Sequence, residues 1–345
     1  MLSLSRDRRL YTRGGGYTMT IGCCLPLNET WHKAIDALQK EFGEGLTIIR
    51  GVQESLAAFS ELDAVIANPV DDHYYEDALR LKAVFIPFVG VNHIPADTLL
   101  RKGMRAYNCH GNAQSVAERA LALALAGFGR IIEYHNDLRQ GLWHGFWVHK
   151  GREDFWHSIF GSRCAILGAG AIGEALAKLL KAFDCSVVGY RRRADAPLPP
   201  YFDEITQDIH RALSGARRVF VALPLTDATK GLIGKDELAA MKGGFLVNVG
   251  RGEVVQEQAL YEALKDGVLS GAGLDVWYQY PQDGSSTGWP SRFPLHELPN
   301  VVLSPHVAGS TFEAVDRNIA LSVENMALWL RSGEALYEVD LRQRY

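Results

Sequence analysis

The sequence is poor in three features, and each shortage excludes a class of protein. No apolar run approaches the length that a membrane-spanning helix needs. With a net charge of −4 and one arginine triplet too short to make a basic field, the chain is not suited to nucleic acid. The five cysteines are an odd number, form no C-x-x-C pair and follow no secretory signal, so we expect reduced thiols in a cytoplasmic protein.

Residues 1–18 differ from the sequence that follows them. Several arginines precede a run of three glycines at 14–16, and the apolar core of a signal peptide is missing. Asp7 argues against a targeting sequence. We expect a flexible N-terminal extension, with Met19 as the first folded residue. The chain of 345 residues is long enough for two domains that each bury a core.

Three glycines carry the clearest signal. Gly168, Gly170 and Gly173 form a G-x-G-x-x-G pattern between an expected strand at 163–167 and an expected amphipathic helix at 174–183. The first glycine permits a tight turn, the second lets a pyrophosphate approach the backbone, and the third lets the helix pack against the strand. The helix N-terminus adds N–H groups and a positive dipole end. Although a merely structural turn would also use glycines, this context predicts dinucleotide binding.

The strand expected next, at 186–190, lacks the acid that an NAD site usually has. A carboxylate at the end of this strand would bind the ribose 2′-hydroxyl. The sequence has Arg191 and Arg192 there instead. A guanidinium binds a 2′-phosphate through charge-assisted bonds, so we expect NADP, with NAD possible. The alternative is a loop of solvated arginines.

Strand and helix patterns alternate along the chain, which predicts parallel βαβ units. Besides 163–167 and 186–190, strands are expected at 19–24, 63–67, 83–87, 105–108, 218–222, 244–249, 271–276 and 301–304. Helices are expected at 29–42 with Asn28 or Thr30 as cap, from 113 to about 136, and at 313–330. The last helix has no place in a finished nucleotide domain and should return to the first domain.

We therefore expect an α/β protein with two Rossmann-like, doubly wound parallel-sheet domains. The nucleotide domain, residues 113–311, would be inserted into a split substrate domain of residues 19–112 and 312–345. A segment at 142–160 is irregular and aromatic, with Trp143, Trp147 and Trp156. It is too long and apolar for an idle loop, so it should pack on a second subunit or cover the cleft between domains.

Three chemically useful side chains follow successive strands of the nucleotide domain. They are Arg251, Asp275 and His306. Reduction of a 2-oxo acid needs a cation for the carboxylate and a proton donor for the developing alkoxide. The planar fork of Arg251 suits the first task, and the imidazole of His306 suits the second. Singly, each could be a surface ion pair or a structural residue. No metal site is predicted.

In these motifs the sequence resembles the D-2-hydroxyacid dehydrogenase family, in consistent order from about residue 64 to 311. The shared stretches include 90–94, 112–118, 139–143, 223–226 and 230–233, besides the glycine loop and the strand ends. The resemblance implies the split-domain topology and a homodimer formed through the nucleotide domain. It also implies that Arg251 binds the substrate carboxylate and that His306 is the acid/base.

The resemblance further implies contacts with the substrate and the cofactor. The substrate carboxylate would meet the backbone of Val89, Gly90 and Val91, and Asp275 would meet the nicotinamide carboxamide. The remaining cofactor contacts would come from Gly168, Gly170, Ala171, Ile172, Gly173, Arg191, Arg192, Leu223, Pro224, Val249, Gly250 and Gly309.

One position departs from the family. Relatives have a Glu that binds the catalytic histidine and raises its pKa, whereas this chain has Tyr280. A phenol can orient an imidazole but cannot stabilise its cation as a carboxylate does. Catalysis could then be slower, Asp283 or Glu297 could supply the charge, or the substrate could need no proton.

The expected function is therefore an NADP-dependent reductase of small 2-oxo acids, glyoxylate or hydroxypyruvate being typical of NADP-using relatives. A formate-like oxidation that needs no proton transfer is one alternative. A cofactor-binding sensor with little turnover is another, although a pure binder would need neither Arg251 nor His306.

Overall fold

The computed structural model describes residues 18–192, 197–282 and 284–344. All but one residue of the predicted extension, and Asp283, lie outside the described part. The chain divides into two compact units, one made of the sequence up to Asn112 together with Phe312 onward, the other of Ala113–Thr311. In the part that is described, no helix is both long and apolar enough to cross a bilayer.

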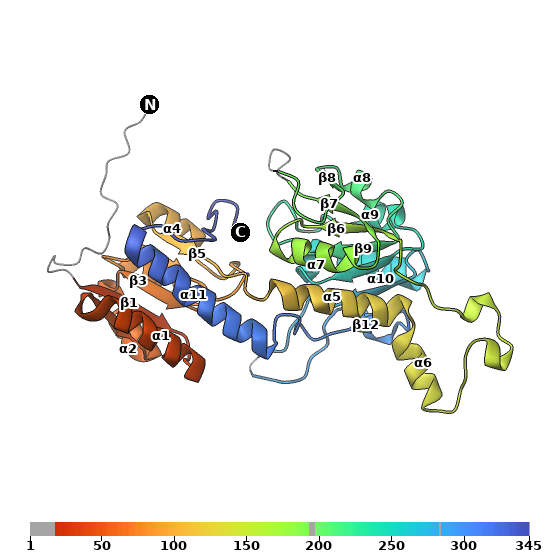
Figure 1. The fold of residues 1–345 in the computed structure, drawn as a ribbon, viewed down its shortest axis with the longest axis horizontal. Coiled ribbons are helices and arrows are strands. Elements are labelled where there is room, and N and C mark those ends of the chain that lie inside the picture. Colours follow the sequence, from red (N-terminus) through yellow and green to blue (C-terminus); the bar gives the residue numbers. More distant parts are fainter. Residues whose placement is uncertain (1–17, 193–196, 283, 345) are drawn as a thin grey trace. The chain divides into compact units, whose positions relative to one another are not determined.

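The first unit is built on a five-stranded parallel sheet of order β2-β1-β3-β4-β5 (Figure 1). Its strands are β1 (Met19–Cys24), β2 (Leu46–Ile49), β3 (Ala64–Ala67), β4 (Ala83–Phe85) and β5 (Arg105–Tyr107). The helices are α1 (Glu29–Phe42), α2 (Val52–Ala57), α3 (Asp72–Asp77), α4 (Ala96–Lys102) and α11 (Phe312–Ser332). The sequence missed β2 and placed the ends of β3, β4 and β5 one or two residues too far out.

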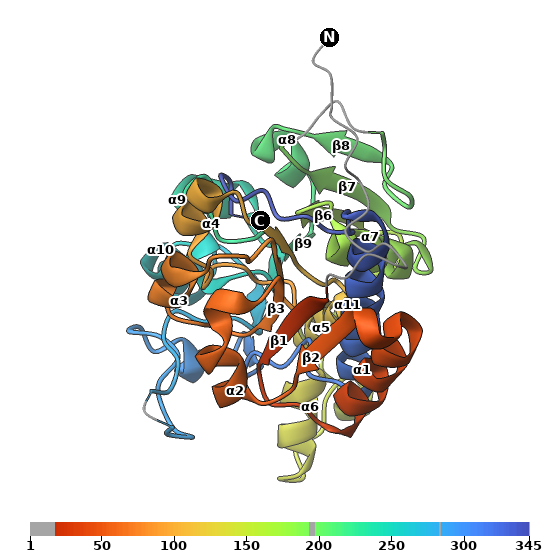
Figure 2. The same ribbon diagram turned by 90° about the vertical axis from the view of Figure 1, so that its left-hand side faces the viewer.

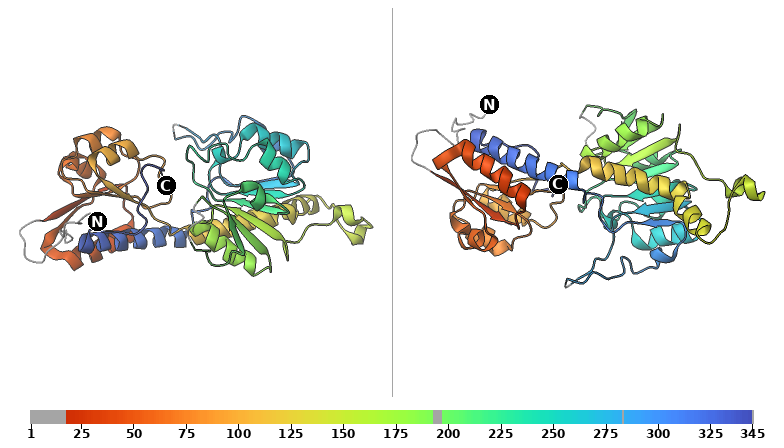
Figure 3. Two further views of the ribbon diagram at one scale, coloured as in Figure 1. Left: turned by 90° about the horizontal axis from the view of Figure 1, so that it is seen from above. Right: turned by 60° about the horizontal axis from the view of Figure 1, so that its bottom comes forward.

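Helix α1 has the predicted bounds. The side chain of Asn28 accepts a hydrogen bond from the Trp31 N–H at 3.0 Å, which caps the helix as expected. Trp31, Ile35 and Phe42 bury one face of α1 in a core shared with Trp329 of α11. The two helices lie side by side on one face of the sheet (Figures 2 and 3). The last helix therefore returns to the first unit, as predicted.

The second unit holds a seven-stranded parallel sheet of order β12-β11-β10-β9-β6-β7-β8. Its strands are β6 (Arg163–Leu167), β7 (Ser186–Tyr190), β8 (Glu204–Thr206), β9 (Arg218–Val221), β10 (Phe245–Asn248), β11 (Gly271–Leu274) and β12 (Val301–Leu303). Its helices are α5 (Ala113–Phe128), α6 (Ile131–Leu138), α7 (Ala171–Lys181), α8 (Ile209–Leu213), α9 (Lys235–Ala240) and α10 (Glu257–Lys265). Strand β8 was not predicted.

Separate apolar cores cover the two faces of this sheet. Helices α5 and α7 bury their apolar residues on one face, and α8, α9 and α10 bury theirs on the other. The prediction of one helix from 113 to about 136 was wrong, because the chain breaks at Gly129 and Arg130. Arg130 has a left-handed backbone (φ 54°), which ends α5 and sets α6 in a new direction.

The strand order reverses between β6 and β9. The chain adds β7 and β8 on one side of β6 and then returns to add β9 on its other side. In open parallel sheets, ligands bind outside the carboxyl ends of the strands at such a switch point. The glycine loop follows β6, and the predicted catalytic residues follow β10, β11 and β12 on the same edge. The predicted fold class, two doubly wound parallel-sheet domains, is confirmed.

Candidate functional site

The glycine loop joins β6 to α7 by a turn that only glycine makes without strain. Gly168 has φ 114°, and a Cβ on it would lie 2.7 Å from the Ala222 carbonyl oxygen of the loop after β9. Gly170 is different, because a Cβ there would meet no atom within 4 Å. The backbone is therefore open at Gly170, where α7 begins without a side-chain cap. An open backbone and uncapped N–H groups fit the pyrophosphate of a nicotinamide dinucleotide.

The arginines after β7 begin beside this loop. The Tyr190 carbonyl accepts a hydrogen bond from the Gly168 N–H at 3.0 Å, so Arg191 is the next residue beyond that contact. The guanidinium of Arg191 donates to the Pro197 carbonyl at 2.8 Å, across a loop whose residues 193–196 are not described. Both Arg191 and Arg192 thus stand at the strand end where a ribose would meet the protein.

The turn after β10 carries Arg251 and is held by a buried amide. Asn248 is 1% exposed. Its side chain accepts from the Gly250 N–H and donates to the Arg251 carbonyl, both at 3.0 Å. The guanidinium of Arg251 donates to the Gly250 carbonyl at 2.7 Å. Its position is therefore fixed by its own turn, and burial lowers the pKa of this guanidinium.

The loop after β12 brings His306 to Tyr280. The Tyr280 hydroxyl lies 2.9 Å from Nδ1 of His306, and it accepts a hydrogen bond from the Trp277 backbone N–H at 3.1 Å. His306 itself has a left-handed backbone, with φ 58°. Such a conformation costs on the order of 1 kcal/mol and is concentrated at functional sites.

The electrostatics of His306 differ from those of a carboxylate-paired histidine. Burial lowers the pKa of the His306 imidazole, and the nearby Arg251 guanidinium lowers it further, while Asp275 acts in the opposite direction. Arg251 and His306 are therefore close enough to interact. Among the described residues, His306 forms no ion pair with a carboxylate. Glu297 lies 3.7 Å from His296 instead.

Asp275 is more deeply engaged than expected of a cofactor contact. It is 1% exposed. Its carboxylate accepts hydrogen bonds from the Ser304 hydroxyl and from the backbone N–H groups of Val307 and Ala308, the latter two at 3.1 and 3.0 Å. These bonds hold the loop that carries His306. A carboxylate has about four acceptor positions, so these three bonds leave room for one more. That the nicotinamide carboxamide makes this bond stays a prediction.

The other predicted cofactor contacts lie on three loops and at the start of α7. Leu223 and Pro224 follow β9, and the loop of Val249 and Gly250 packs on them so closely that a Cβ on Gly250 would lie 2.6 Å from the Leu223 carbonyl oxygen. Ala171 and Ile172 begin α7, and Gly309 lies in the turn after β12.

Val89, Gly90 and Val91 follow β4 in the first unit, where the Asn108 side chain donates to the Val89 carbonyl at 2.9 Å.

The sequence analysis missed three residues that hold the site loops by hydrogen bonds, namely Asn248, Ser304 and Trp277. Their polar atoms at buried strand ends were the only available signal. No group of three or more metal-ligating side chains occurs among the described residues.

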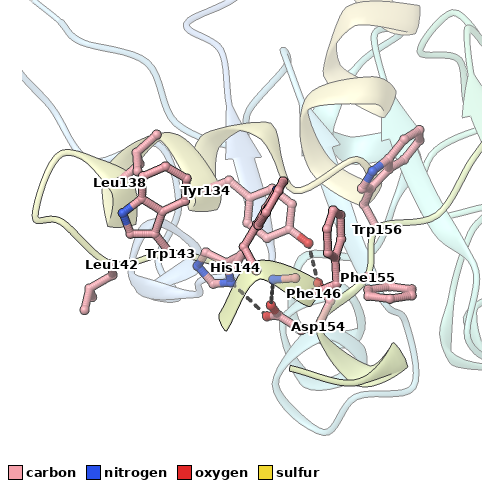
Figure 4. Close-up of a pocket in the computed structure, with 11 residues that line it drawn as sticks. Tyr134, Leu138, Leu142, Trp143, His144, Phe146, Asp154, Phe155 and Trp156 are labelled. Atoms are coloured by element: carbon pink, nitrogen blue, oxygen red, sulfur yellow. Dashed lines mark hydrogen bonds and ion pairs between the residues drawn. The ribbon is translucent and has the colours of Figure 1, made fainter. Parts of the chain in front are cut away.

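The aromatic segment forms an arm, here residues 130–160, on the nucleotide unit. The arm begins with α6, and its part at 142–160 is irregular as predicted, with short 3₁₀ turns at Phe146–Val148 and Arg152–Asp154. A cavity of about 410 Å³ lies within it (Figure 4). His144 organises the arm, since its Nδ1 lies 2.8 Å from Asp154 and its Nε2 lies 2.8 Å from Asp137. Both carboxylates favour the imidazolium and raise the pKa of His144.

Comparison with known proteins agrees with this geometry. The profile of the family described as "D-isomer specific 2-hydroxyacid dehydrogenase, NAD binding domain" matches residues 121–308. A glyoxylate reductase of Korarchaeum cryptofilum is 32% identical over 78% of this chain and 79% of its own. A glyoxylate/hydroxypyruvate reductase B of Pectobacterium carotovorum is 35% identical over 77% and 80% of the two chains.

A solved structure is similar over nearly the whole chain. The NADPH-dependent glyoxylate/hydroxypyruvate reductase of Sinorhizobium meliloti, in complex with NADP and malonate, superposes with a TM-score of 0.71. It is 26% identical and covers 94% of this chain and 98% of its own.

A Rossmann-type sheet with an open glycine loop, and with an arginine after β10 and a histidine after β12, is typical of a nicotinamide-dependent oxidoreductase. The chain belongs to the D-isomer specific 2-hydroxyacid dehydrogenase family and is an NAD(P)-dependent 2-hydroxyacid oxidoreductase.

Proposed function

We propose that this enzyme uses NADP(H) to reduce small 2-oxo acids, with glyoxylate and hydroxypyruvate as the first substrates to test. The observation that carries the proposal is a half-buried guanidinium after β10 whose charge lowers the pKa of an imidazole after β12. The names of the relatives support the substrate class. Arg191 and Arg192 at the end of β7, with no acid between them and the strand, support the choice of NADP.

Each residue has one task in the proposed reaction. The bound cofactor would supply a hydride to the 2-carbon of the substrate. Arg251 would bind the carboxylate and polarise the carbonyl, together with the backbone of Val89–Val91. His306 would give a proton to the developing alkoxide, and Tyr280 would orient its ring. Asp275 would hold the histidine loop and meet the carboxamide.

A substrate panel tests the function directly. Consumption of NADPH and of NADH is followed side by side with glyoxylate, hydroxypyruvate, pyruvate and larger 2-oxo acids. Turnover that is faster with NADPH supports the proposal. Tight NADPH binding without turnover would favour a sensor. Reduction of NADP by formate would favour a reaction without proton transfer, which the absence of a carboxylate at position 280 makes worth testing.

Tyr280→Glu is expected to shift the pH–rate profile upward. The general acid is the imidazolium, so activity falls as pH rises through the pKa of His306. That pKa is lowered in the wild-type protein. A carboxylate beside Nδ1 would raise it, and the reduction of 2-oxo acids would persist to higher pH. The measurement is kcat/KM between about pH 5 and 9. With Tyr280→Phe as the uncharged control, an unmoved profile in the glutamate variant would contradict the role of Tyr280.

We also propose a homodimer formed through the arm, in a cytoplasmic protein. The arm exposes large apolar side chains, among them Phe146 at 67%, Trp147 at 74% and Phe160 at 66%. Such patches on a folded surface mark protein contacts. All five cysteines are without disulfide bonds, which supports a reducing compartment.

Trp147→Glu is expected to weaken self-association at least tenfold, because it would bury a charge in the contact. Sedimentation equilibrium over a range of concentrations measures the effect. Leu79→Glu is the matched control, since Leu79 is 78% exposed on the first unit. A dimer that responds to the control as strongly as to the arm variant would refute this interface.

A further inference from the structure

Trp277 is a buried residue that contacts Ser304 and Tyr280, the two residues that hold His306. It follows β11, two residues after Asp275, and is 6% exposed. Its indole N–H donates a hydrogen bond to the Ser304 carbonyl oxygen at 2.8 Å, and this bond is buried. The same carbonyl accepts the backbone N–H of His306 at 3.0 Å. One oxygen atom therefore links the indole to the backbone of the histidine.

This link acts on the strained part of the loop. The bond from the His306 N–H to the Ser304 oxygen spans only two residues and closes a tight turn with His306 at φ 58°. A non-glycine residue keeps such a conformation only where its surroundings determine it. The indole N–H of Trp277 is a second donor to the Ser304 oxygen and fixes the orientation of that carbonyl. It thereby also fixes the backbone of His306.

The second support runs through the phenol. The Trp277 backbone N–H donates to the Tyr280 hydroxyl oxygen at 3.1 Å. An oxygen that accepts this bond keeps its own proton for the Nδ1 atom of His306, 2.9 Å away. A neutral imidazole that accepts at Nδ1 carries its proton on Nε2. The ring and the backbone of His306 are thus both held by groups that Trp277 anchors.

Trp277 also contacts the turn that carries the arginine. A Cβ on Gly252, the residue after Arg251, would lie 2.2 Å from the Trp277 carbonyl oxygen. The two loops therefore touch at Trp277, and the charged and titratable groups around His306 are Arg251, Asp275 and Tyr280.

We propose that Trp277 is a positioning residue for His306. The indole N–H of Trp277 fixes the histidine backbone in a site where, among the described residues, no carboxylate holds the imidazole ring. The kinetic part of this inference rests on the proposed reduction of 2-oxo acids. The placement of the ring does not, because it can be observed in the enzyme without substrate.

The test removes the indole N–H while keeping an aromatic ring at position 277. Trp277→Phe is expected to lower kcat about tenfold, the effect of one buried hydrogen bond, with KM and NADPH affinity changed less than about twofold. Replacing the residue by benzothienylalanine, which has sulfur in place of the N–H at nearly the same shape, should give the same loss. In the Tyr280→Glu background the loss should shrink to about twofold, because a carboxylate would then hold the ring.

Nitrogen NMR of the histidine rings gives a readout without turnover, with the His306 signals assigned by their absence in His306→Gln. In the wild-type enzyme above the pKa, the proton should lie on Nε2. Trp277→Phe keeps the backbone N–H that binds Tyr280 but loses the indole bond to the Ser304 carbonyl, so the backbone of His306 should shift, its Nδ1 should leave the Tyr280 hydroxyl and the two tautomers should mix. Unchanged His306 signals together with an equal loss of kcat in both backgrounds would overturn the proposal and leave Trp277 a packing residue. If no 2-oxo acid is reduced, the proposed function fails, but the NMR result still decides the role of Trp277.

Discussion

A His306→Ala enzyme is expected to reduce 2-oxo acids about two to four orders of magnitude more slowly than the wild type, the usual contribution of a positioned general acid. The alkoxide would then have to take its proton from water. NADPH binding should hardly change, because the imidazole of His306 is not among the predicted cofactor contacts.

Steady-state kcat with the best substrate of the panel measures this effect, and fluorescence titration measures NADPH affinity. His210→Ala serves as the matched control, since that histidine lies exposed on α8. A rate within about threefold of wild type in His306→Ala would remove His306 from the reaction.

Arg191→Asp is expected to weaken NADPH binding about a hundredfold and to leave NADH binding within about threefold of wild type. A charge-assisted bond to the 2′-phosphate contributes about 1.5–3 kcal/mol, and the new carboxylate would also repel the phosphate. The same carboxylate can accept a bond from the 2′-hydroxyl of NADH.

The dissociation constants of both cofactors, measured at one ionic strength, give the comparison, because salt screens such contacts. Arg211→Asp makes the same charge change on the exposed face of α8, where Arg211 pairs with Glu204. An equal loss for NADPH and NADH in Arg191→Asp would contradict the assignment of Arg191.

Much of the fold could be predicted because strand and helix patterns are local. The strand at 163–167, the cap at Asn28 and the helix at 29–42 match the structure residue for residue. The errors also have local causes. The left-handed residue Arg130, which splits the helix after 113, has no sequence signature, since arginine is not a residue that favours this conformation.

For the candidate site, the sequence could predict which side chains come to one edge of the sheet, but not the hydrogen bonds that hold them there. Arg251, Asp275 and His306 follow β10, β11 and β12, which are adjacent in the sheet. The rule that parallel strands end at one edge was therefore enough to predict that these residues lie on the same edge. The bonds of Asn248, Trp277 and Ser304 join residues brought together by loops. Loop geometry depends on tertiary contacts, which a periodic pattern does not contain.

The long segment between β11 and β12 has its two ends fixed by the sheet. The Asp275 N–H donates to the Asn248 carbonyl at 3.0 Å, and the Asn300 carbonyl accepts a hydrogen bond from the Ala272 N–H at 2.9 Å. Changes within the segment therefore leave these ends in place. Position 280 belongs to this segment. A single substitution there can therefore change the pKa of the proposed proton donor, His306, while the backbone that positions His306 stays in place.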